Sequence, residues 1–295
     1  MSTHELQRAR PLLGTLVEIR VSGADGKALA GAIDSAFRAV ARVHALMSYH
    51  RARSDVGRIN RLAWRTPVRV HPWTYVVLRE AQRVAQASGG LFDVSVARDL
   101  VARRMLPALP GARVPTCSAS FRDIRLLPGF RVRFVRPLLL DLGGIAKGFA
   151  VDRAVERLRA AGVRNGVVNA GGDLRCFGPR IERVHVRHPA DPTVLLPLAE
   201  LREGAVATSA AYFTRRRLAG REVSAQVHPR RPRYVPSDSV SVAAARCITA
   251  DAWTKVLLLG GARLLGRARR AGAFGRLLRA AKIAPIPVLV QADAL

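Results

Sequence analysis

Three glycine-containing segments of the chain carry polar side chains at spacings that suit a phosphate or a metal ion. In the first, LDLGGIAKGFAVD (140–152), Asp141 is expected to end a strand, and Gly143 and Gly144 to turn the chain into a helix. Such a junction offers backbone N–H groups and the positive end of the helix dipole to an anion. Lys147 would lie in the first helical turn, where a cation opposes the dipole, and this conflict favours an anion bound beside it. A strand–helix turn with a solvated lysine explains the same residues.

The second segment, NAGGD (169–173), places two glycines between two polar side chains. Gly171 and Gly172 permit positive φ angles and a close approach of the backbone to a ligand. Asn169 and Asp173 can hydrogen-bond either to a ligand or to the turn itself. The pattern therefore indicates a ligand-binding loop or a tight hairpin turn, and these residues alone do not distinguish the two.

The third segment, CITADAWTKVLLLGG (247–261), has the pattern of a helix start. Thr249 is expected to cap the helix, with Asp251 and Thr254 in the first turn, three residues apart and so on one face. A carboxylate and a hydroxyl side by side suit Mg²⁺, which prefers oxygen ligands and also binds substrate phosphates. The alternative is that Asp251 only complements the helix dipole.

Hydrophobic periodicity places these segments among mixed strands and helices. Apolar residues one helical turn apart, from Ile33 to Met47, predict a long helix, and glycines at 89–90 and 162 predict where two others end. Strands and helices that do not alternate strictly indicate an α+β or mixed α/β fold. No linker divides 1–295, which is expected to be one domain, with two tightly packed subdomains left open. Helices are expected at 28–50, 72–88, 146–161, from about 251, and at 263–280, the last basic and amphipathic; strands are expected at 12–22, 131–136, 138–142, 167–168, 183–188, 204–208, 223–228, 238–244 and 288–292.

Composition narrows the class of protein. Apolar residues make up 49% of the chain and charged residues 24%, which is typical of a folded globular protein. The net charge of +28 would suit nucleic acid, but only four of the 49 basic residues are lysine, the basic runs are short, and aromatic residues make up 5%. Nucleic acid is therefore not the expected partner, although the charge attracts anions in general. The three cysteines have no metal-type spacing. Neither a membrane-spanning stretch nor a secretory signal is visible, so a cytoplasmic protein is expected.

Taken in order, several segments resemble the ApbE family of FAD:protein FMN transferases: RPLLGTLVEI, MSYHRARSDVGRIN, GGLFDVSV, LDLGGIAKGFAVD, NAGGDLRCFG, VATSAAYF and CITADAWTKVLLLGG. The resemblance covers nearly the whole chain and implies a mixed α/β fold related to the tunnelling fold. It also implies a Mg²⁺-dependent reaction in which a threonine or serine hydroxyl of a target flavoprotein attacks the FMN-side phosphorus of FAD, and AMP leaves. Two alternatives remain: hydrolysis of FAD to FMN and AMP, as in some relatives, and a non-catalytic protein that binds flavin or nucleic acid.

The resemblance also implies roles for individual residues. Mg²⁺ would be held by Asp251, the region of Thr254 and a backbone carbonyl near Gly144, and catalysis would depend on Asp251, Lys147 and His228. The residues expected to bind FAD are Leu13, His50, Phe92, Asp93, Asp141, Lys147, Asn169, Gly171, Gly172, Asp173, Thr208, Ser209 and Ala225.

This chain departs from the family pattern at two functional positions. Relatives often carry His-x-x-Asp-Pro where this chain has AQVHP (225–229), so that Ala225 stands where a histidine base is sometimes proposed. His228 is a candidate replacement. The usual threonine four residues after Asp251 is Lys255 here, with Thr254 one position earlier. Lys255 could hold phosphates by its charge where the threonine would bind the metal.

Overall fold

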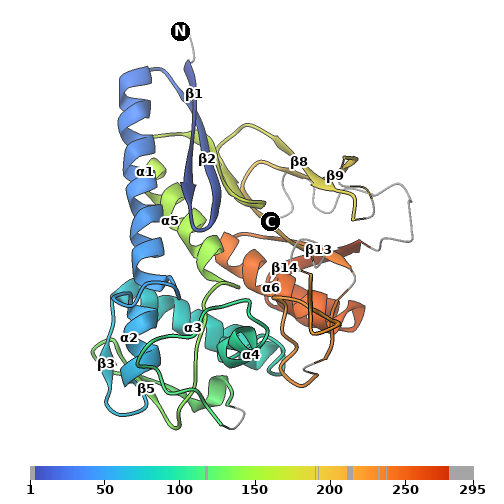
Figure 1. Cartoon of the computed structure of the whole chain (residues 1–295). Coiled ribbons are helices and arrows are strands. Elements are labelled where there is room, and N and C mark those ends of the chain that lie inside the picture. Colours follow the sequence, from blue (N-terminus) through green and yellow to red (C-terminus); the bar gives the residue numbers. More distant parts are fainter. Residues whose placement is uncertain are drawn as a thin grey trace. The chain divides into compact units, whose positions relative to one another are not determined.

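The chain divides into two compact units (Figure 1). The computed structural model describes residues 4–116, 119–189, 191, 193–210, 215–231, 233–236 and 238–278. The first unit, called the sheet unit, comprises 1–44, 147–210 and 238–295, and the second, called the insert unit, comprises 45–146 and 211–237. Because each unit is assembled from separate pieces of the chain, no single point in the sequence marks the boundary.

The sheet unit is built on a seven-stranded sheet in which all neighbours are antiparallel, in the order β1-β2-β6-β7-β10-β13-β14. Its strands are β1 (His4–Leu12), β2 (Thr15–Gly23), β6 (Asn165–Ala170), β7 (Asp173–Phe177), β10 (Gly204–Ala210), β13 (Ser239–Ala244) and β14 (Ala273–Leu278). The strand register places Ile19, Val168, Arg175 and Ala205 on one face, since each is paired with the next. The side chains that alternate with them point to the other face.

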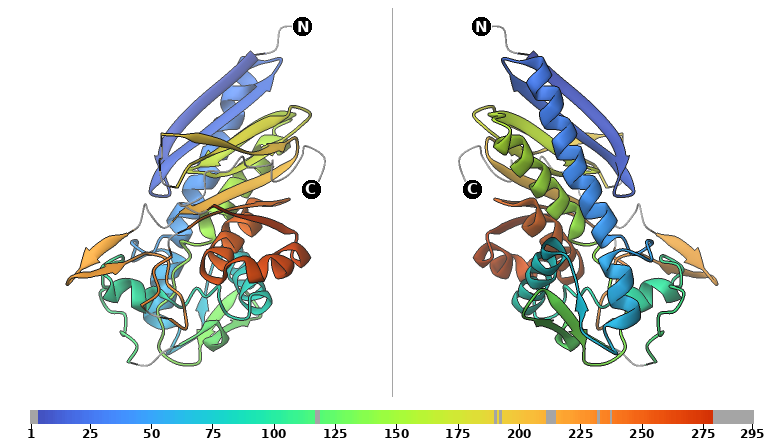
Figure 2. Two further views of the ribbon diagram at one scale, coloured as in Figure 1. Left: turned by 90° about the vertical axis from the view of Figure 1, so that its right-hand side faces the viewer. Right: turned by 90° about the vertical axis from the view of Figure 1, so that its left-hand side faces the viewer.

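Helices cover the face that carries Ile19 and Val168. Two of them, α1 (Gly26–Met47) and α5 (Ala146–Ala160), run across the sheet side by side (Figure 2). A third, α6 (Cys247–Gly260), packs against β7, β10, β13 and β14, and is followed by the 3-10 turn η2 (Ala262–Leu264) and the short α7 (Leu265–Arg270). In the described part of the chain, no helix is both long and apolar enough to cross a membrane.

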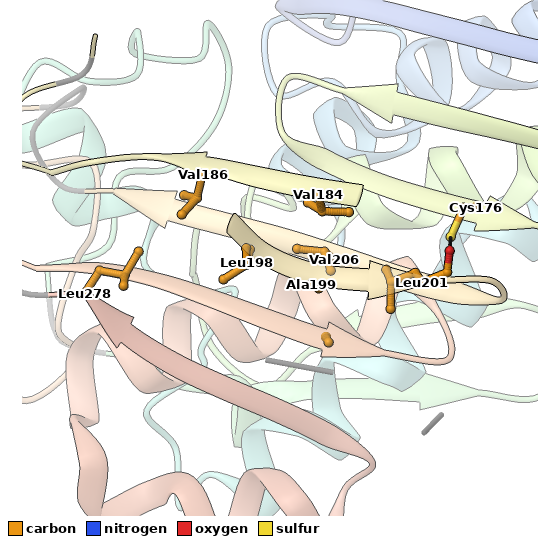
Figure 3. Packing of buried hydrophobic residues seen from close by; sticks show 9 residues of the cluster. Cys176, Val184, Val186, Leu198, Ala199, Leu201, Val206 and Leu278 are labelled. Atoms are coloured by element: carbon orange, nitrogen blue, oxygen red, sulfur yellow. Dashed lines mark hydrogen bonds between the residues drawn. The ribbon is translucent and has the colours of Figure 1, made fainter. Parts of the chain in front are cut away.

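The other face of β7, β10 and β13 is covered by the hairpin of β8 (Glu182–Arg187) and β9 (Leu195–Leu201). Figure 3 shows Val184 and Leu198 of this hairpin packed over Val206, and Leu278 joins the same cluster from β14. Every described residue of β13 is buried, because α6 covers one face and this hairpin the other. Of the two serines of β13, Ser241 bonds the hydroxyl of Thr208, whereas the Ser239 hydroxyl is buried with no hydrogen-bond partner among the described residues.

The described residues of the insert unit form three helices and two small sheets. Its helices are α2 (Asp55–Leu62), α3 (Pro72–Ala87) and α4 (Ala97–Ala102), with the 3-10 turn η1 (Phe121–Asp123). One sheet has the order β3-β5-β4, formed by β3 (Val68–Arg69), β5 (Arg131–Phe134) and β4 (Ile124–Leu127). The other is the hairpin of β11 (Arg216–Leu218) and β12 (Arg221–Val223). Asp55 joins the first two helices: its Oδ2 accepts the hydroxyl of Thr74 at 2.7 Å and the N–H of His71 at 2.8 Å.

Most predicted helices and strands are confirmed, but some are absent and several described elements were not predicted. The segment 138–142 is not a strand, apart from an isolated bridge from Leu139 to Val96, because the side-chain amide of Asn60 bonds both the N–H and the C=O of Leu140. The strand expected at 223–228 ends at Val223. The helix expected at 263–280 is wrong: it is replaced by η2, α7 and β14, the last paired along its length with β13. The described elements that were not predicted are β1, β3, β4, β7, β9, β11, α2 and α4. The strand expected at 288–292 lies outside the described residues.

Candidate active site

Two hairpin turns lie next to each other at one end of the sheet. Leu13, in the turn between β1 and β2, has a φ of 57°, and its N–H donates to Nδ1 of His44 at 2.9 Å. In the turn between β6 and β7, Gly171 and Gly172 have φ angles of 64° and 95°. A Cβ atom on Gly171 would lie 2.3 Å from Oγ1 of Thr15. The two turns are therefore so close that only glycine fits at residue 171.

The NAGGD segment forms the hairpin turn between β6 and β7, so the hairpin interpretation of this pattern is confirmed for its backbone. Asn169 is used within the turn: its Oδ1 accepts the N–H of Gly172 at 2.9 Å, and its Nδ2 donates to Glu18 at 3.3 Å. Asp173 is fully buried and pairs with Lys147. The anion beside Lys147 is therefore a carboxylate of the protein itself.

Four charged side chains meet where α5 and α6 lie against the sheet. Asp173 of β7 pairs with Lys147 of α5, and Asp251 pairs with Lys255 one turn further along α6. Both carboxylates have 0% exposure, whereas the lysine side chains keep 28% (Lys147) and 14% (Lys255). We call these residues the four-charge cluster. Their formal charges sum to zero, and each carboxylate also lies in the field of the other pair.

These groups control one another's ionisation. Burial acts to lower the pKa of Lys147, but the charges of Asp173 and Asp251 outweigh it and raise that pKa above its usual value. Burial opposes the ionisation of Asp251, yet the ammonium groups of Lys255 and Lys147 lower its pKa. Burial and the charge of Asp251 raise the pKa of Asp173. Oδ1 of Asp173 is buried and has no hydrogen-bond partner among the described residues, which suits it to receive a further donor.

The helix that carries Asp251 begins earlier than the sequence predicts. Asp152 of α5 accepts the N–H of Cys247 at 2.9 Å and that of Ile248 at 3.0 Å, and so caps α6 from outside. Thr249, the expected cap, lies inside the helix, and Asp251 lies in the second turn. The prediction was wrong because the capping carboxylate comes from a different helix, which a local cap pattern does not show.

α5 and α6 cross closely at Gly148. The N–H of Gly148 donates to Oδ2 of Asp251 at 3.0 Å, while Lys255 donates to Oδ1 of the same carboxylate. A Cβ atom on Gly148 would lie 2.3 Å from the carbonyl oxygen of Cys247 and 2.8 Å from Cβ of Asp251. The absence of a side chain at residue 148 therefore allows the backbone of α5 to bond the Asp251 carboxylate.

The adjacent Thr208 and Ser209 point to opposite faces of the sheet. Ser209 lies on the helix-covered face, where its hydroxyl bonds Oγ1 of Thr254 at 2.7 Å. Thr208 lies on the other face and bonds the hydroxyl of Ser241 at 2.8 Å. The two residues, both expected to bind FAD, are therefore not brought together by the structure.

The described groups around Asp251 do not fit a divalent cation. Both carboxylate oxygens are engaged, and the Thr254 hydroxyl donates to the backbone carbonyl of Asp251 at 2.7 Å. A divalent ion ~4 Å from the Lys255 ammonium would be repelled by roughly 8 kcal/mol at an effective dielectric constant of about 20, before the carboxylates are counted. Within the described ranges, no three or more His, Cys, Asp or Glu side chains are placed to share a metal ion. The backbone carbonyl near Gly144, the other predicted ligand, stays a prediction.

In the insert unit, Asp141 and His50 lie close together beside Tyr49. Burial raises the pKa of Asp141. Two weaker influences lower it: the N–H of Gly143, which donates to Oδ2 at 2.9 Å, and the charge of His50. The Tyr49 ring meets the His50 ring edge-on, with centroids 6.1 Å apart. Burial and the Asp141 charge raise the pKa of Tyr49 to about 12. The Tyr49 hydroxyl, absent from the predicted set, is buried with no hydrogen-bond partner among the described residues.

Phe92 and Asp93 are fixed in the loop between α3 and α4. Oδ1 of Asp93 accepts the N–H and the hydroxyl of Ser95 at 2.8 and 2.7 Å, and Oδ2 accepts the N–H of Phe121 at 3.0 Å. Burial nevertheless raises the pKa of Asp93. Phe92 is 3% exposed, and its N–H donates to Oγ of Ser88 at 3.1 Å. Both residues therefore shape the loop that contains them.

His228, the candidate base, lies in a tight turn of the insert unit. Its Nδ1 accepts the N–H of Arg230 at 3.1 Å, and its ring meets Tyr234 edge-on, with centroids 5.6 Å apart. The imidazole is 4% exposed. Since an imidazole nitrogen that accepts an N–H is the unprotonated one, the basic nitrogen of His228 is occupied by the backbone. Ala225 lies three residues earlier in the same loop, at intermediate burial.

The predicted residues are divided between the two units. The sheet unit holds Leu13, Lys147, Asn169, Gly171, Gly172, Asp173, Thr208, Ser209, Asp251 and Thr254, and the insert unit holds His50, Phe92, Asp93, Asp141, Gly144, Ala225 and His228. Gly148 and Asp152 are missing from the predicted set, although their spacing of four residues places them on one face of α5. The one sequence feature that could have pointed to Tyr49 as a site residue is its position directly before His50.

Comparison with known proteins agrees with this architecture. FAD:protein FMN transferases from Treponema pallidum and Vibrio cholerae are each 27% identical to the chain, over 84% and 96% of its length and 76% and 86% of their own. The crystal structure of the ApbE protein of Thermotoga maritima matches with a TM-score of 0.81 at 26% identity, covering 94% of this chain and 97% of that one. The ApbE family model matches residues 13–271. The chain belongs to the ApbE family.

Proposed function

We propose that this chain is an FAD:protein FMN transferase, which moves FMN from FAD to a threonine or serine hydroxyl of a target flavoprotein and releases AMP. The observation that carries the proposal is the four-charge cluster: Lys147 and Lys255 are held by buried carboxylates and keep part of their side chains exposed. The name borne by relatives that match most of the chain supports the same activity.

The cluster suits a diphosphate because transfer at phosphorus depends mostly on positioning and on neutralising charge on oxygen. Each ammonium has three N–H donors and uses one on its carboxylate partner, so that donors remain for phosphate oxygens. The carboxylates of Asp173 and Asp251 fix where these donors lie. Next to Asp173, the β6–β7 turn presents backbone with open space beside it, since no atom lies within 4 Å of a Cβ built on Gly172, and the same holds for Gly14 in the β1–β2 turn.

In the proposed reaction the acceptor hydroxyl oxygen attacks the phosphorus on the FMN side of FAD. One P–O bond forms to that oxygen, and the P–O bond to the oxygen that bridges the two phosphates breaks. AMP leaves with the bridging oxygen, and the hydroxyl proton finishes on the AMP phosphate, so that no water or oxidant is consumed. Lys147 and Lys255 offset the charge that develops on the phosphate oxygens.

The insert unit, taken by itself, carries further residues predicted to contact FAD. Asp141, His50 and Tyr49 form a compact polar group there, and the buried hydroxyl of Tyr49 is a donor without a described partner. A buried donor of this kind is satisfied when a bound molecule supplies an acceptor. We therefore expect the flavin nucleotide to contact this group.

Incubating the full chain with FAD and flavoprotein domains that offer an accessible threonine or serine tests the proposal. The expected result is a flavin-fluorescent acceptor band that survives denaturing electrophoresis, with one AMP released per FMN attached. The variant Lys147→Met should abolish the band, whereas Lys27→Met, at an exposed lysine of the sheet unit, should not. Steady AMP release without any labelled acceptor would replace the proposal with FAD hydrolysis.

A further inference from the structure

Lys255 occupies the position on Asp251 that a metal ion would need. Its ammonium donates to Oδ1, while the Gly148 N–H bonds Oδ2, so no oxygen of this carboxylate is left without a donor. The lysine is fixed by geometry as well as by charge, since residues four apart on a helix lie on one face. Its side chain is 14% exposed and that of Asp251 0%.

The balance of charge also differs from that of a metal site. Two carboxylates and two ammonium groups already neutralise one another in the four-charge cluster. In the absence of a diphosphate, a divalent ion would add two positive charges to a buried group whose own charges already cancel, and burial of unmatched charge is unfavourable. With a neutral residue at 255, the same carboxylates would leave one negative charge unmatched, and a cation would be favoured.

We propose that the ammonium of Lys255 takes the place of a divalent cation beside Asp251, so that this chain binds the diphosphate of FAD with lysine charge alone. The proposal rests on the function proposed above, because it concerns the same diphosphate. It assigns Lys255 to the binding of phosphate, together with Lys147, and it assigns Asp251 to positioning the lysine.

Binding of FAD to the full chain, followed by quenching of flavin fluorescence, tests the proposal without any turnover. The wild-type chain should show the same Kd in EDTA as in MgCl₂. Lys255→Thr should bind FAD about 10- to 100-fold more weakly in EDTA, as expected for the loss of a charge-assisted hydrogen bond, and MgCl₂ should restore its affinity. Lys255→Arg should remain independent of metal, and Lys27→Thr is the control for loss of an exposed lysine.

A second measurement uses Mn²⁺ alone, followed by its electron paramagnetic resonance signal. The wild-type chain should leave the signal of free Mn²⁺ unchanged, whereas Lys255→Thr should reduce it in proportion to protein. Mn²⁺ bound stoichiometrically by the wild-type chain, or FAD bound by it only in MgCl₂, would overturn the proposal even if Lys255→Thr does not fold. A wild-type chain that binds FAD in neither buffer would instead overturn the proposed function, while the Mn²⁺ titration still decides the cation question.

Discussion

The sheet unit and the insert unit hold their predicted site residues by different means. In the sheet unit, Asp173 and Asp251 lie on a strand and a helix, are fully buried and are matched by lysines. In the insert unit, Asp93 and His228 lie on loops and are held by backbone N–H groups. Buried charges that depend on one another leave an unmatched charge when one is removed, whereas a loop residue bonded to nearby backbone leaves mainly a looser loop. The sheet unit should therefore tolerate substitution at its site far less well.

The largest effect is expected for Asp251→Ala. Removing one partner of a buried ion pair costs about 3–5 kcal/mol of stability, because the other charge stays buried. FMN transfer should fall below detection, with a smaller loss of FAD binding, since Lys147 keeps its partner. Urea unfolding and the acceptor-labelling assay measure the two effects.

The matched control for Asp251→Ala is Glu203→Ala, which removes the carboxylate paired with Arg159 in an ion pair whose side chains are 52% and 43% exposed. An exposed pair contributes about 0–1 kcal/mol. Equal losses of stability in the two variants would contradict the picture of a buried, interdependent cluster.

Gly148→Ala should come next. The new Cβ would meet the Cys247 carbonyl at 2.3 Å, so the crossing of α5 and α6 must widen and the bond from residue 148 to Asp251 must lengthen. Overpacking of this kind costs about 1–3 kcal/mol. Gly31→Ala is the control: it lies within α1 with no atom inside 4 Å of its Cβ position, and should raise stability by about 0.5–1 kcal/mol. If Gly148→Ala left the free energy of unfolding unchanged, the crossing of α5 and α6 would not be close-packed.

His228→Ala should lower kcat for transfer by less than about tenfold, because the basic nitrogen of the imidazole already accepts the Arg230 N–H. Its main effect should be a lower Tm, from the loss of the turn that it holds. His185→Ala, which removes an exposed imidazole on β8, is the control. A fall in kcat of about 10²–10⁴ at unchanged Tm would instead identify His228 as the general base.

The smallest effect is a dependence on pH. Burial raises the pKa of Asp93 in the folded chain, so its contribution to stability is full below the usual carboxyl pKa and is lost as pH rises through the folded value. The stability of wild type relative to Asp93→Asn, which does not titrate, should therefore decrease with rising pH over that range. Urea unfolding at a series of pH values measures it, and a difference that stays constant or grows would contradict the assignment.

Local patterns predict the elements but not the partners of their side chains. The helix from 146 ends as expected before Gly162, where a φ of 82° requires a residue without a side chain. By contrast, nothing near Lys147 in the sequence shows that its anion is Asp173, because the sheet brings β7 to the start of α5. The same reason explains why Thr249 was wrongly predicted as the cap of α6: the capping carboxylate, Asp152, lies on α5.

Secondary structure was predicted less well in segments whose residue pattern fits one element while a distant part of the chain imposes another. The stretch 263–280 has the basic and apolar spacing of a helix, yet Ala273–Leu278 pairs along its whole length with β13. Pairing with a buried strand outweighs helix propensity, which is worth only some tenths of a kcal/mol per residue. At 138–142, an apolar run suggests a strand, but Asn60 takes both backbone groups of Leu140. The partners that decide these two segments, β13 and Asn60, are both distant from them in the sequence.

The order of strands in the large sheet has a consequence for synthesis on the ribosome. β1 and β2 are made before the other strands of this sheet, but the inner edge of β2 is paired by β6, which begins only at Asn165. Until then the nascent chain exposes an unpaired strand edge, the kind of surface that other chains can join. The Arg8 and Arg10 side chains, which both reach Asp34, place charge on the outer strand of this early hairpin. Charge of this sort discourages pairing at the outer edge of β1, whereas the inner edge of β2 is covered only when β6 pairs with it.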